Sequence, residues 1–596
     1  MFKFKISYVA LAAALSATGV NADPFSYNHL SGAKVIDIEA PNAAGVSHNM
    51  YREFNVSDKG VILNNSASDV VHGTLGNIAR NNNLANGSAS VILNEVTSNK
   101  SSALNGFIEV NGQRADVVIA NPNGISCSGC SFVNTNKVVM TTGKVNMTDA
   151  GAIGSYTVTG GKISIDGNGM NAAENYAALL ADVISLNGQV NVKNAMISAG
   201  NFTLNNSTGQ ITSAGKTATL KQMLFPEYSI DVSAMGGVKA DNITMVGNNL
   251  GFGVRNTGAI VAKGVLSMAS NGMLVNERSI TNNGMVTQIM SAGEIKNTGN
   301  ISSANIAVLN SANNLVNTGT IFSGNQMAVS AASDLSNKGT IKAINELVIA
   351  TNGNLENMGA AYIHSGNRLT ISAAGNITQK GGSMYGANTA FTFGGNSFTS
   401  DRYIYGTETL QITSTKDNQL SSGEIINSGS MSGGDILIQT NGTITQHANS
   451  QIKASKSLTT ASNWLNNSGY MGGTYTTVMI QNNKTDNYGH IEGTGVSVIT
   501  SGDLYNEALI RSWGDLTLST QNKGNIINRG HIKAQNTLNL TAKKVENGGY
   551  KCGFLNLKTC GVGALTANKL ILDSSHKYAS NMGGNQNFKA TEITAR

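Results

Sequence analysis

The sequence predicts an all-β protein, a right-handed parallel β-helix (solenoid) with coils of about 20 residues and a capped N-terminal domain. Three observations predict this fold. The composition is polar without being charged, since 12% of the 596 residues are charged, 40% are hydrophobic and 68 are Gly. Asparagine returns at a fixed interval, and the runs between these positions alternate apolar with other residues. Such a chain has enough apolar content to fold, and its many turn residues favour short strands.

The first element is a secretory signal peptide, which we expect at residues 1–22. Lys3 and Lys5 precede an apolar stretch, and residues 20–22 (VNA) form a small-residue cleavage site. A membrane anchor is the alternative, but about a dozen apolar residues are too few to cross a bilayer. We therefore expect the mature chain to begin at Asp23 and to lie outside the cytoplasm.

The repeats that begin near residue 256 predict stacked coils. The residues that close successive units are Asn256, Asn276, Asn297, Asn317, Asn337 and Asn357. The steps between them are 20 or 21 residues. The same phase returns later, with His447 in an intermediate slot, at Asn427, Asn467, Asn487, Asn506 and Asn528. A period in the twenties is typical of solenoids, in which each unit buries its apolar face against its neighbours.

Each unit contains short strands and sharp corners. Residues 339–344 and 346–350 alternate apolar with other side chains, which is the period of a strand and not of a helix. The Asn-x-Gly corner is expected to need a positive φ, which Gly adopts freely and Asn tolerates. Equivalent Asn amides are expected to form a hydrogen-bonded ladder along the stack.

One stretch, near 380–409, departs from this pattern and is predicted to be irregular. The Asn-x-Gly corner disappears there, and aromatic residues gather at Tyr385, Phe391, Phe393, Phe398, Tyr403 and Tyr405. Two interpretations remain open. The rings either fill the core of an irregular coil or side hairpin, or they form an exposed patch for binding.

The four cysteines form two close pairs, Cys127 with Cys130 and Cys552 with Cys560. In an exported chain, local disulfides are the expected state. A shared metal site is disfavoured, because four ligands must converge on one ion and the pairs lie far apart in sequence. We therefore expect neither a metal nor a cofactor.

Charge and motifs predict neither a nucleic-acid partner nor catalysis. The 40 basic and 34 acidic residues are scattered, without a basic run. The G-x-S-x-G, H-E-x-x-H and phosphate-loop motifs are not found, and charged residues are too sparse to build an acid–base pair at the coil period. The sequence thus predicts a protein that is not an enzyme and has no small-molecule substrate.

The segment NPNGISCSGC at residues 121–130 resembles the secretion domain of two-partner-secretion exoproteins. This family comprises filamentous haemagglutinins, related haemolysins and contact-dependent growth-inhibition toxins. Residues 45–65, 87–96 and 230–258 also resemble family blocks. The resemblance covers about residues 28–258 by blocks and the remainder by repeat type.

This resemblance implies a domain organisation and a secretion motif. Residues 23–255 would be the two-partner-secretion (haemagglutination activity) domain, and 256–596 would be haemagglutinin-type β-helix repeats. The first motif, NPNGI, comprises Asn121, Pro122, Asn123, Gly124 and Ile125. The second family motif, NPNL, is matched by Asn81, Asn83 and Leu84, whereas Asn82 replaces its Pro. The restriction that Pro places on φ is lost at that position.

The resemblance also implies function. We expect a secreted adhesin or haemagglutinin-like exoprotein of a Gram-negative bacterium, presenting a β-helical rod for cell adhesion. Its export would run via the periplasm through an outer-membrane β-barrel transporter. Its second partner would be an unknown receptor on a host or bacterial cell. The alternative is a haemolysin, a cytolysin or a truncated contact-dependent growth-inhibition toxin of the same family.

Overall fold

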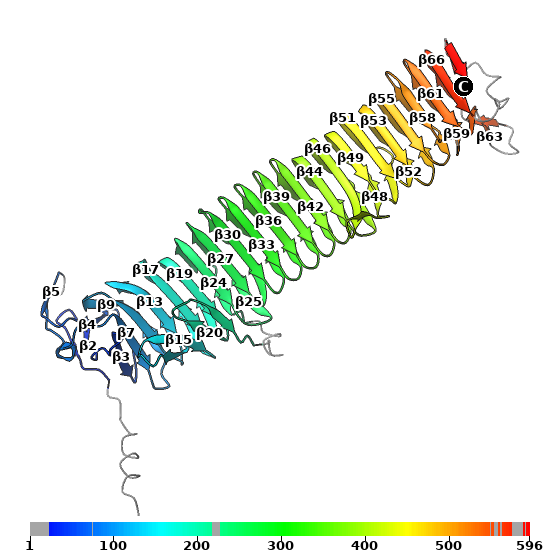
Figure 1. The fold of residues 1–596 in the computed structure, drawn as a ribbon. Helices are drawn as coiled ribbons and strands as arrows, with labels where there is room; N and C mark the ends of the chain where they lie inside the picture. The colour runs from blue at the N-terminus through cyan, green and yellow to red at the C-terminus, as the bar shows by residue number, and fades with distance from the viewer. Residues whose placement is uncertain are drawn as a thin grey trace, which may run out of the picture. The chain divides into compact units, whose positions relative to one another are not determined.

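The computed structural model describes residues 23–73, 76–216, 227–521, 523–548, 550–552, 558–560, 563–574, 588–589 and 592–595. The predicted signal peptide lies outside these residues. The described chain is a parallel β-solenoid built from short strands, which confirms the predicted fold class (Figure 1). Its one helix within these ranges is a 3₁₀ turn at Asn82–Leu84, and no helix there has the length and apolarity to cross a bilayer. The chain divides into two units, one ending at Asn283 and the other beginning at Gly284.

The first unit stacks its coils along three parallel ladders, two of which contain the following strands. One ladder contains β3 (Val46–Tyr51), β7 (Val91–Val96), β10 (Ala115–Ala120), β13 (Thr135–Thr141), β17 (Met170–Ala181), β19 (Gln189–Ala199), β24 (Asn242–Gly247) and β27 (Val265–Ser270). The other contains β8 (Ser102–Leu104), β11 (Ile125–Cys127), β16 (Lys162–Ile165), β18 (Val183–Leu186), β22 (Ile230–Val232), β25 (Phe252–Asn256) and β28 (Met273–Asn276). Each coil therefore pairs with its neighbour through backbone bonds in every sheet.

The first unit also contains antiparallel strands in addition to its parallel ladders. Strand β1 (Ser26–Asn28) pairs antiparallel with β2 (Lys34–Asp37) at the start of the stack. A separate antiparallel sheet is formed by β14 (Lys144–Met147), β15 (Ile153–Val158), β20 (Phe202–Asn205) and β21 (Ile211–Ser213). Its buried Tyr156 and Phe202 pack with Val118 and Leu180 of the solenoid wall. The unit thus has a second apolar core outside the coils.

The second unit repeats one coil of three strands. Strands β33 (Ile306–Ser311), β34 (Leu315–Asn317) and β35 (Thr320–Ser323) are followed by β36 (Gln326–Ala331), β37 (Leu335–Asn337) and β38 (Thr340–Ala343). The next coil contains β39 (Glu346–Thr351), β40 (Leu355–Met358) and β41 (Tyr362–Ser365). Equivalent strands pair in parallel and in register, so Leu315, Leu335 and Leu355 lie above one another and are fully buried.

The predicted amide ladder is present inside the solenoid. Asn297, Asn317, Asn337 and Asn357 are completely buried. Each Nδ2 donates to the side-chain oxygen one coil on, with N···O distances of 2.7–2.8 Å, and Gln379 receives the bond from Asn357. A second run extends from Asn467 through Asn487, Asn506 and Asn528 to Asn547.

The prediction that His447 occupies a ladder position is wrong, because Gln446 occupies it. Gln446 pairs with Asn427 in register and accepts its Nδ2 at 2.9 Å, whereas His447 follows one residue later in the turn. Gln is one methylene longer than Asn but carries the same amide, so it continues the ladder. An imidazole offers no equivalent carbonyl oxygen.

The corner glycines have a different role from the predicted one. Gly319 and Gly339 do not lie in the left-handed region of φ. A Cβ at Gly339 would overlap the carbonyl oxygen of Gly319, and one at Gly319 would overlap that of Gly299. Glycine is needed at these corners because successive backbones approach closely, and not because of a positive φ.

The aromatic stretch near 380–409 continues the coil with strands. It contains β44 (Ser383–Phe393), β45 (Ser397–Ser400) and the start of β46 (Tyr403–Lys416), although the pairing of β44 with β46 shifts register between Gly386 and Asn388. Gln379 and Ser400 occupy its buried ladder positions, so the coil persists without the Asn-x-Gly corner. The only antiparallel pairing of these strands comes later, where β46 folds back on β47 (Gln419–Leu420).

The rings in this stretch divide between core and surface. Phe391, Phe393 and Phe398 are completely buried and pack against one another. Tyr385 stacks between His364 and Tyr405, with ring centroids 3.9 and 4.9 Å apart, in a row along the outer face. The two interpretations of the sequence therefore each describe part of the stretch.

Candidate functional site

The two asparagine-rich loops share one local structure. The Oδ1 of Asn81 accepts the N–H of Asn83, and the Oδ1 of Asn121 accepts the N–H of Asn123, both at 2.9 Å. Each loop is closed by a backbone bond across three residues, from Leu84 to Asn81 and from Gly124 to Asn121. Each is therefore an Asx-turn, in which a side chain stands in for a backbone carbonyl.

The Asn121 loop is anchored on the preceding coil. The buried Nδ2 of Asn121 donates to Lys100 O and to Ser102 Oγ, both at 2.9 Å. The Nδ2 of Asn123 donates to Ser98 O at 2.7 Å. Gly124 has a φ of 114°, which a side chain would strain.

Burial divides the NPNGI motif into two groups. Asn121, Gly124 and Ile125 are buried, with Ile125 beginning β11, whereas Pro122 and Asn123 are exposed. The buried members hold the backbone in shape. Only the exposed pair offers side chains to another protein.

The Asn81 loop is anchored in the same way on a different coil. The Nδ2 of Asn81 donates to Ile38 O at 2.8 Å and to Asn64 O at 3.0 Å. Asn83 donates to the same Ile38 oxygen, and Leu84 is buried. The exposed edge here consists of Asn82 and Asn83.

One carboxylate lies behind this loop. Asp37 accepts the Nδ2 of Asn64 at 2.7 Å, which fixes the strand that receives Asn81. Burial raises the pKa of Asp37, and the hydrogen bond from Asn64 opposes that rise.

The two motifs use separate supports. One is held by Ile38 and Asn64, the other by Ser98, Lys100 and Ser102. None of these five partners was predicted from the sequence. Five of the six bonds go to backbone oxygens, which the sequence pattern does not reveal.

The replacement of Pro by Asn82 leaves the turn intact. Asn81 has φ −84° and ψ 114°, the extended conformation that a residue before Pro adopts, and Asn82 is the first residue of the 3₁₀ turn. Pro is favoured at such a first helical position because its φ is already correct. The backbone at position 82 is therefore compatible with the Pro of the family motif.

Asn82→Pro is expected to stabilise the first unit by about 0.4–1 kcal/mol, because it restricts the unfolded chain while fitting the native turn. Chemical denaturation of the purified protein measures this change. Asn83→Pro is the matched control, since it removes the N–H that donates to Asn81 and should destabilise the same turn. Equal stability of the two variants would contradict this account of the turn.

Cys127 and Cys130 form a disulfide with a Cα–Cα distance of 5.5 Å. It joins the end of β11 to the start of β12 (Cys130–Val133), and both residues are fully buried. A buried disulfide is inaccessible to a thiol partner and acts as a covalent brace beside the Asn121 loop.

The second cysteine pair lies in a hairpin. Strand β63 (Tyr550–Cys552) pairs antiparallel with β64 (Lys558–Cys560). The side chains of Cys552 and Cys560 are outside the described residues, so their disulfide stays a prediction. Within the described part of the chain, no group of three or more His, Cys, Asp or Glu residues could hold a metal ion.

Comparison with known proteins identifies the class of protein. Residues 13–276 match the family model described as the TPS secretion domain. A protein named tRNA nuclease CdiA from Yersinia mollaretii is 38% identical over 277 residues, covering 46% of this chain and 9% of the relative. A protein named 16S rRNA endonuclease CdiA from Enterobacter cloacae is 32% identical over 300 residues, covering 49% and 9%.

A solved structure is also similar. The crystal structure of a filamentous hemagglutinin secretion domain is 30% identical, covers 49% of this chain and 95% of its own, and has a TM-score of 0.39.

Residues 13–276 form a secretion domain of the two-partner-secretion exoprotein family. The chain matches about 9% of the length of the curated relatives. A TPS secretion domain implies a partner transporter in the outer membrane and export across that membrane to the surface or surroundings of a Gram-negative cell.

The prediction that the protein is not an enzyme is corrected by these relatives, which are named as nucleases. That prediction relied on the absence of known catalytic motifs. Members of one secretion family can have different activities, and a search for a few motifs does not exclude them. The matched part is the secretion region, so the names describe the relatives. The expected absence of a nucleic-acid partner gains no support, since both names refer to RNA.

Proposed function

We propose that the transporter recognises the exposed edges of the two Asx-turns, Asn82–Asn83 and Pro122–Asn123. The observation that supports this is the pattern common to both loops: a buried Asn, two exposed residues and a buried closing residue. Two copies of one turn, each braced by a buried amide, present the same short edge twice. A rigid edge loses little conformational entropy on binding.

Pro122→Ala combined with Asn123→Ala is expected to reduce secretion about tenfold, because it removes both exposed side chains and keeps the buried anchor. Immunoblots of culture supernatant and periplasm, with the transporter co-expressed, measure the secreted fraction. A tenfold loss corresponds to about 1.4 kcal/mol of recognition.

The matched control is Asn187→Ala, which removes an exposed amide of the same unit that also makes one hydrogen bond, to Asp166. Its secretion should equal that of the parent chain. Comparable secretion of the double variant and this control would show that the transporter does not recognise Pro122 and Asn123. The thermal midpoints of the purified proteins show whether a loss comes from misfolding.

The finer proposal is that the exported repeats act as an adhesin. It is supported by exposed apolar and aromatic side chains on the outer faces of the second unit, namely Ile344, Val348, Tyr362, Tyr403 and Tyr475. Exposed apolar groups among uncharged polar residues suit contact with another surface. Bacteria that express the chain with its transporter should bind host or bacterial cells in greater number than bacteria with the transporter alone.

A second candidate function is delivery of a growth-inhibiting toxin. The names of the relatives favour it, because the two reported above are CdiA proteins named as nucleases. Co-culture with a strain that lacks the chain tests it. A fall in the viable count of that strain, dependent on contact and on the transporter, would place delivery ahead of adhesion.

A further inference from the structure

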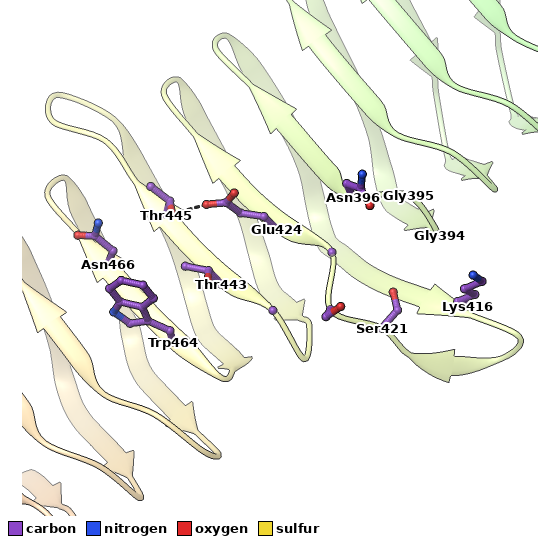
Figure 2. Close-up of a pocket in the computed structure, with 13 residues that line it drawn as sticks. Gly394, Gly395, Asn396, Lys416, Ser421, Glu424, Thr443, Thr445, Trp464 and Asn466 are labelled. Carbon is purple, nitrogen blue, oxygen red and sulfur yellow. Dashed lines mark hydrogen bonds between the residues drawn. The ribbon is translucent and has the colours of Figure 1, made fainter.

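A groove of about 760 Å³ crosses three neighbouring strands of the second unit and the turn before a fourth. The three strands are β48 (Glu424–Asn427), β50 (Thr443–Gln446) and β52 (Trp464–Asn467), and the turn at residues 394–396 precedes β45. Figure 2 shows Trp464 at one end, Lys416 of the β46–β47 hairpin at the other, and Glu424 with Thr445 between them. Gly395, Gly423 and Gly442 line the groove, so no side chain rises from these positions to fill it.

Trp464 is fixed in place from the far side. Its Nε1 donates to Asp486 at 3.0 Å, and the Nζ of Lys484 lies 5.3 Å from the ring centroid. Lys484 in turn pairs with Asp486 at 3.1 Å. These partners belong to the following coil, whereas Thr443 lies opposite Trp464 in the preceding one. The ring is therefore held rigidly on one side and borders the groove on the other.

The remaining polar groups suit a ligand with many hydroxyls. Glu424 accepts the hydroxyl of Thr445 at 2.9 Å. The side-chain amides of Asn396 and Asn466 have no hydrogen-bond partner among the residues that the structure describes. Each amide offers both a donor and an acceptor to a ligand.

The charged side chains of the groove do not suit a polyanionic ligand. One carboxylate, Glu424, and one ammonium, Lys416, are the charged groups among the lining residues, so they balance. Sulfated glycans and nucleic acids need clusters of Lys and Arg. An uncharged ligand does not need such a cluster of basic residues.

We propose that this groove binds an uncharged glycan chain. The C–H face of a sugar ring packs on the free face of Trp464, and sugar hydroxyls pair with Asn396, Asn466 and Glu424. The glycine positions let an extended chain lie close to the backbone. The inference deepens the proposed adhesin function by naming the chemistry of its receptor, and it rests on that function for its biological meaning.

Trp513 supplies the matched control. It is the second of two tryptophans in the chain, is 47% exposed and has the guanidinium of Arg511 4.3 Å from its ring centroid. It resembles Trp464 in having a cationic neighbour, but it is more exposed to solvent and does not line the groove.

The experiment applies the purified secreted chain, Trp464→Ala and Trp513→Ala to an array of uncharged and anionic glycans. The parent chain and Trp513→Ala should bind a set of uncharged glycans, and Trp464→Ala should lose about tenfold or more in affinity for them. Binding only to anionic glycans, binding to no uncharged glycan, or equal binding by Trp464→Ala would each overturn the proposal.

Two further measurements keep the test decisive. If Trp464→Ala does not fold, Asn466→Ala replaces it, because that side chain makes no bond within the described protein. In the single-tryptophan variant Trp513→Phe, a bound glycan should shift the emission of Trp464 saturably, whereas Trp464→Phe should show no shift.

Cell adhesion of the same variants separates the two proposals. Glycan binding without adhesion to any cell would refute the adhesin function and leave the groove assigned. Adhesion that survives Trp464→Ala, with glycan binding lost, would assign adhesion to another surface.

Discussion

Asn317→Ala is expected to lower the free energy of unfolding of the second unit by about 3 kcal/mol or more, because it leaves several buried polar groups unpaired. The Nδ2 of Asn317 donates to Asn337 Oδ1 at 2.8 Å and to Thr340 O at 3.1 Å. Its Oδ1 accepts from Asn297 at 2.8 Å. Water cannot replace these bonds at a fully buried position.

Chemical denaturation and amide hydrogen exchange measure this effect. Since repeat proteins open locally, exchange should increase first in the coils next to residue 317. Asn310→Ala is the matched control, because Asn310 is exposed on the neighbouring strand β33. Similar losses for the two variants would show that the ladder adds nothing beyond ordinary surface amides.

Gly339→Ala is expected to be as damaging, for a steric reason. The added Cβ would overlap the carbonyl oxygen of Gly319 in the preceding coil, so the two backbones must separate. Strands in a sheet lie about 4.8 Å apart, and a forced separation weakens the adjoining hydrogen bonds. We expect a loss of about 3 kcal/mol, in the range of other severe packing defects.

Limited proteolysis near residues 319–339 and the thermal midpoint test this expectation. Gly160→Ala is the control, because a Cβ there meets no atom within 4 Å and the φ of Gly160 is not positive. A Gly339→Ala protein with the protease resistance of the control would refute the close-approach account of the corners.

The repeating fold could be predicted because it depends on residues at a constant interval. The ladder from Asn297 to Asn357 keeps one spacing and one side chain, and the alternation in residues 346–350 places Leu347 and Ile349 inside. The prediction was wrong at His447, where the interval shortens by one and Gln446 supplies the amide. Near 380–409 the marker Asn is absent because Gln379 and Ser400 occupy its positions.

The candidate sites were predicted less completely. The two motifs were found by resemblance, but the division into buried Asn121 and exposed Asn123 depends on which coil carbonyls lie nearby. The groove had no sequence signal. Asn396, Glu424 and Trp464 belong to different coils, and only stacking brings them to one face.

The amide ladder also has a direction. Every rung from Asn297 to Asn357 donates a side-chain N–H to the amide oxygen of the following coil. A terminal rung of a partly assembled stack therefore presents an unfilled donor that the next stretch of chain alone can satisfy. Aligned amide dipoles polarise one another, so each addition strengthens that donor. A stack that grew from its N-terminal end would thereby offer each new coil a donor at its open rung.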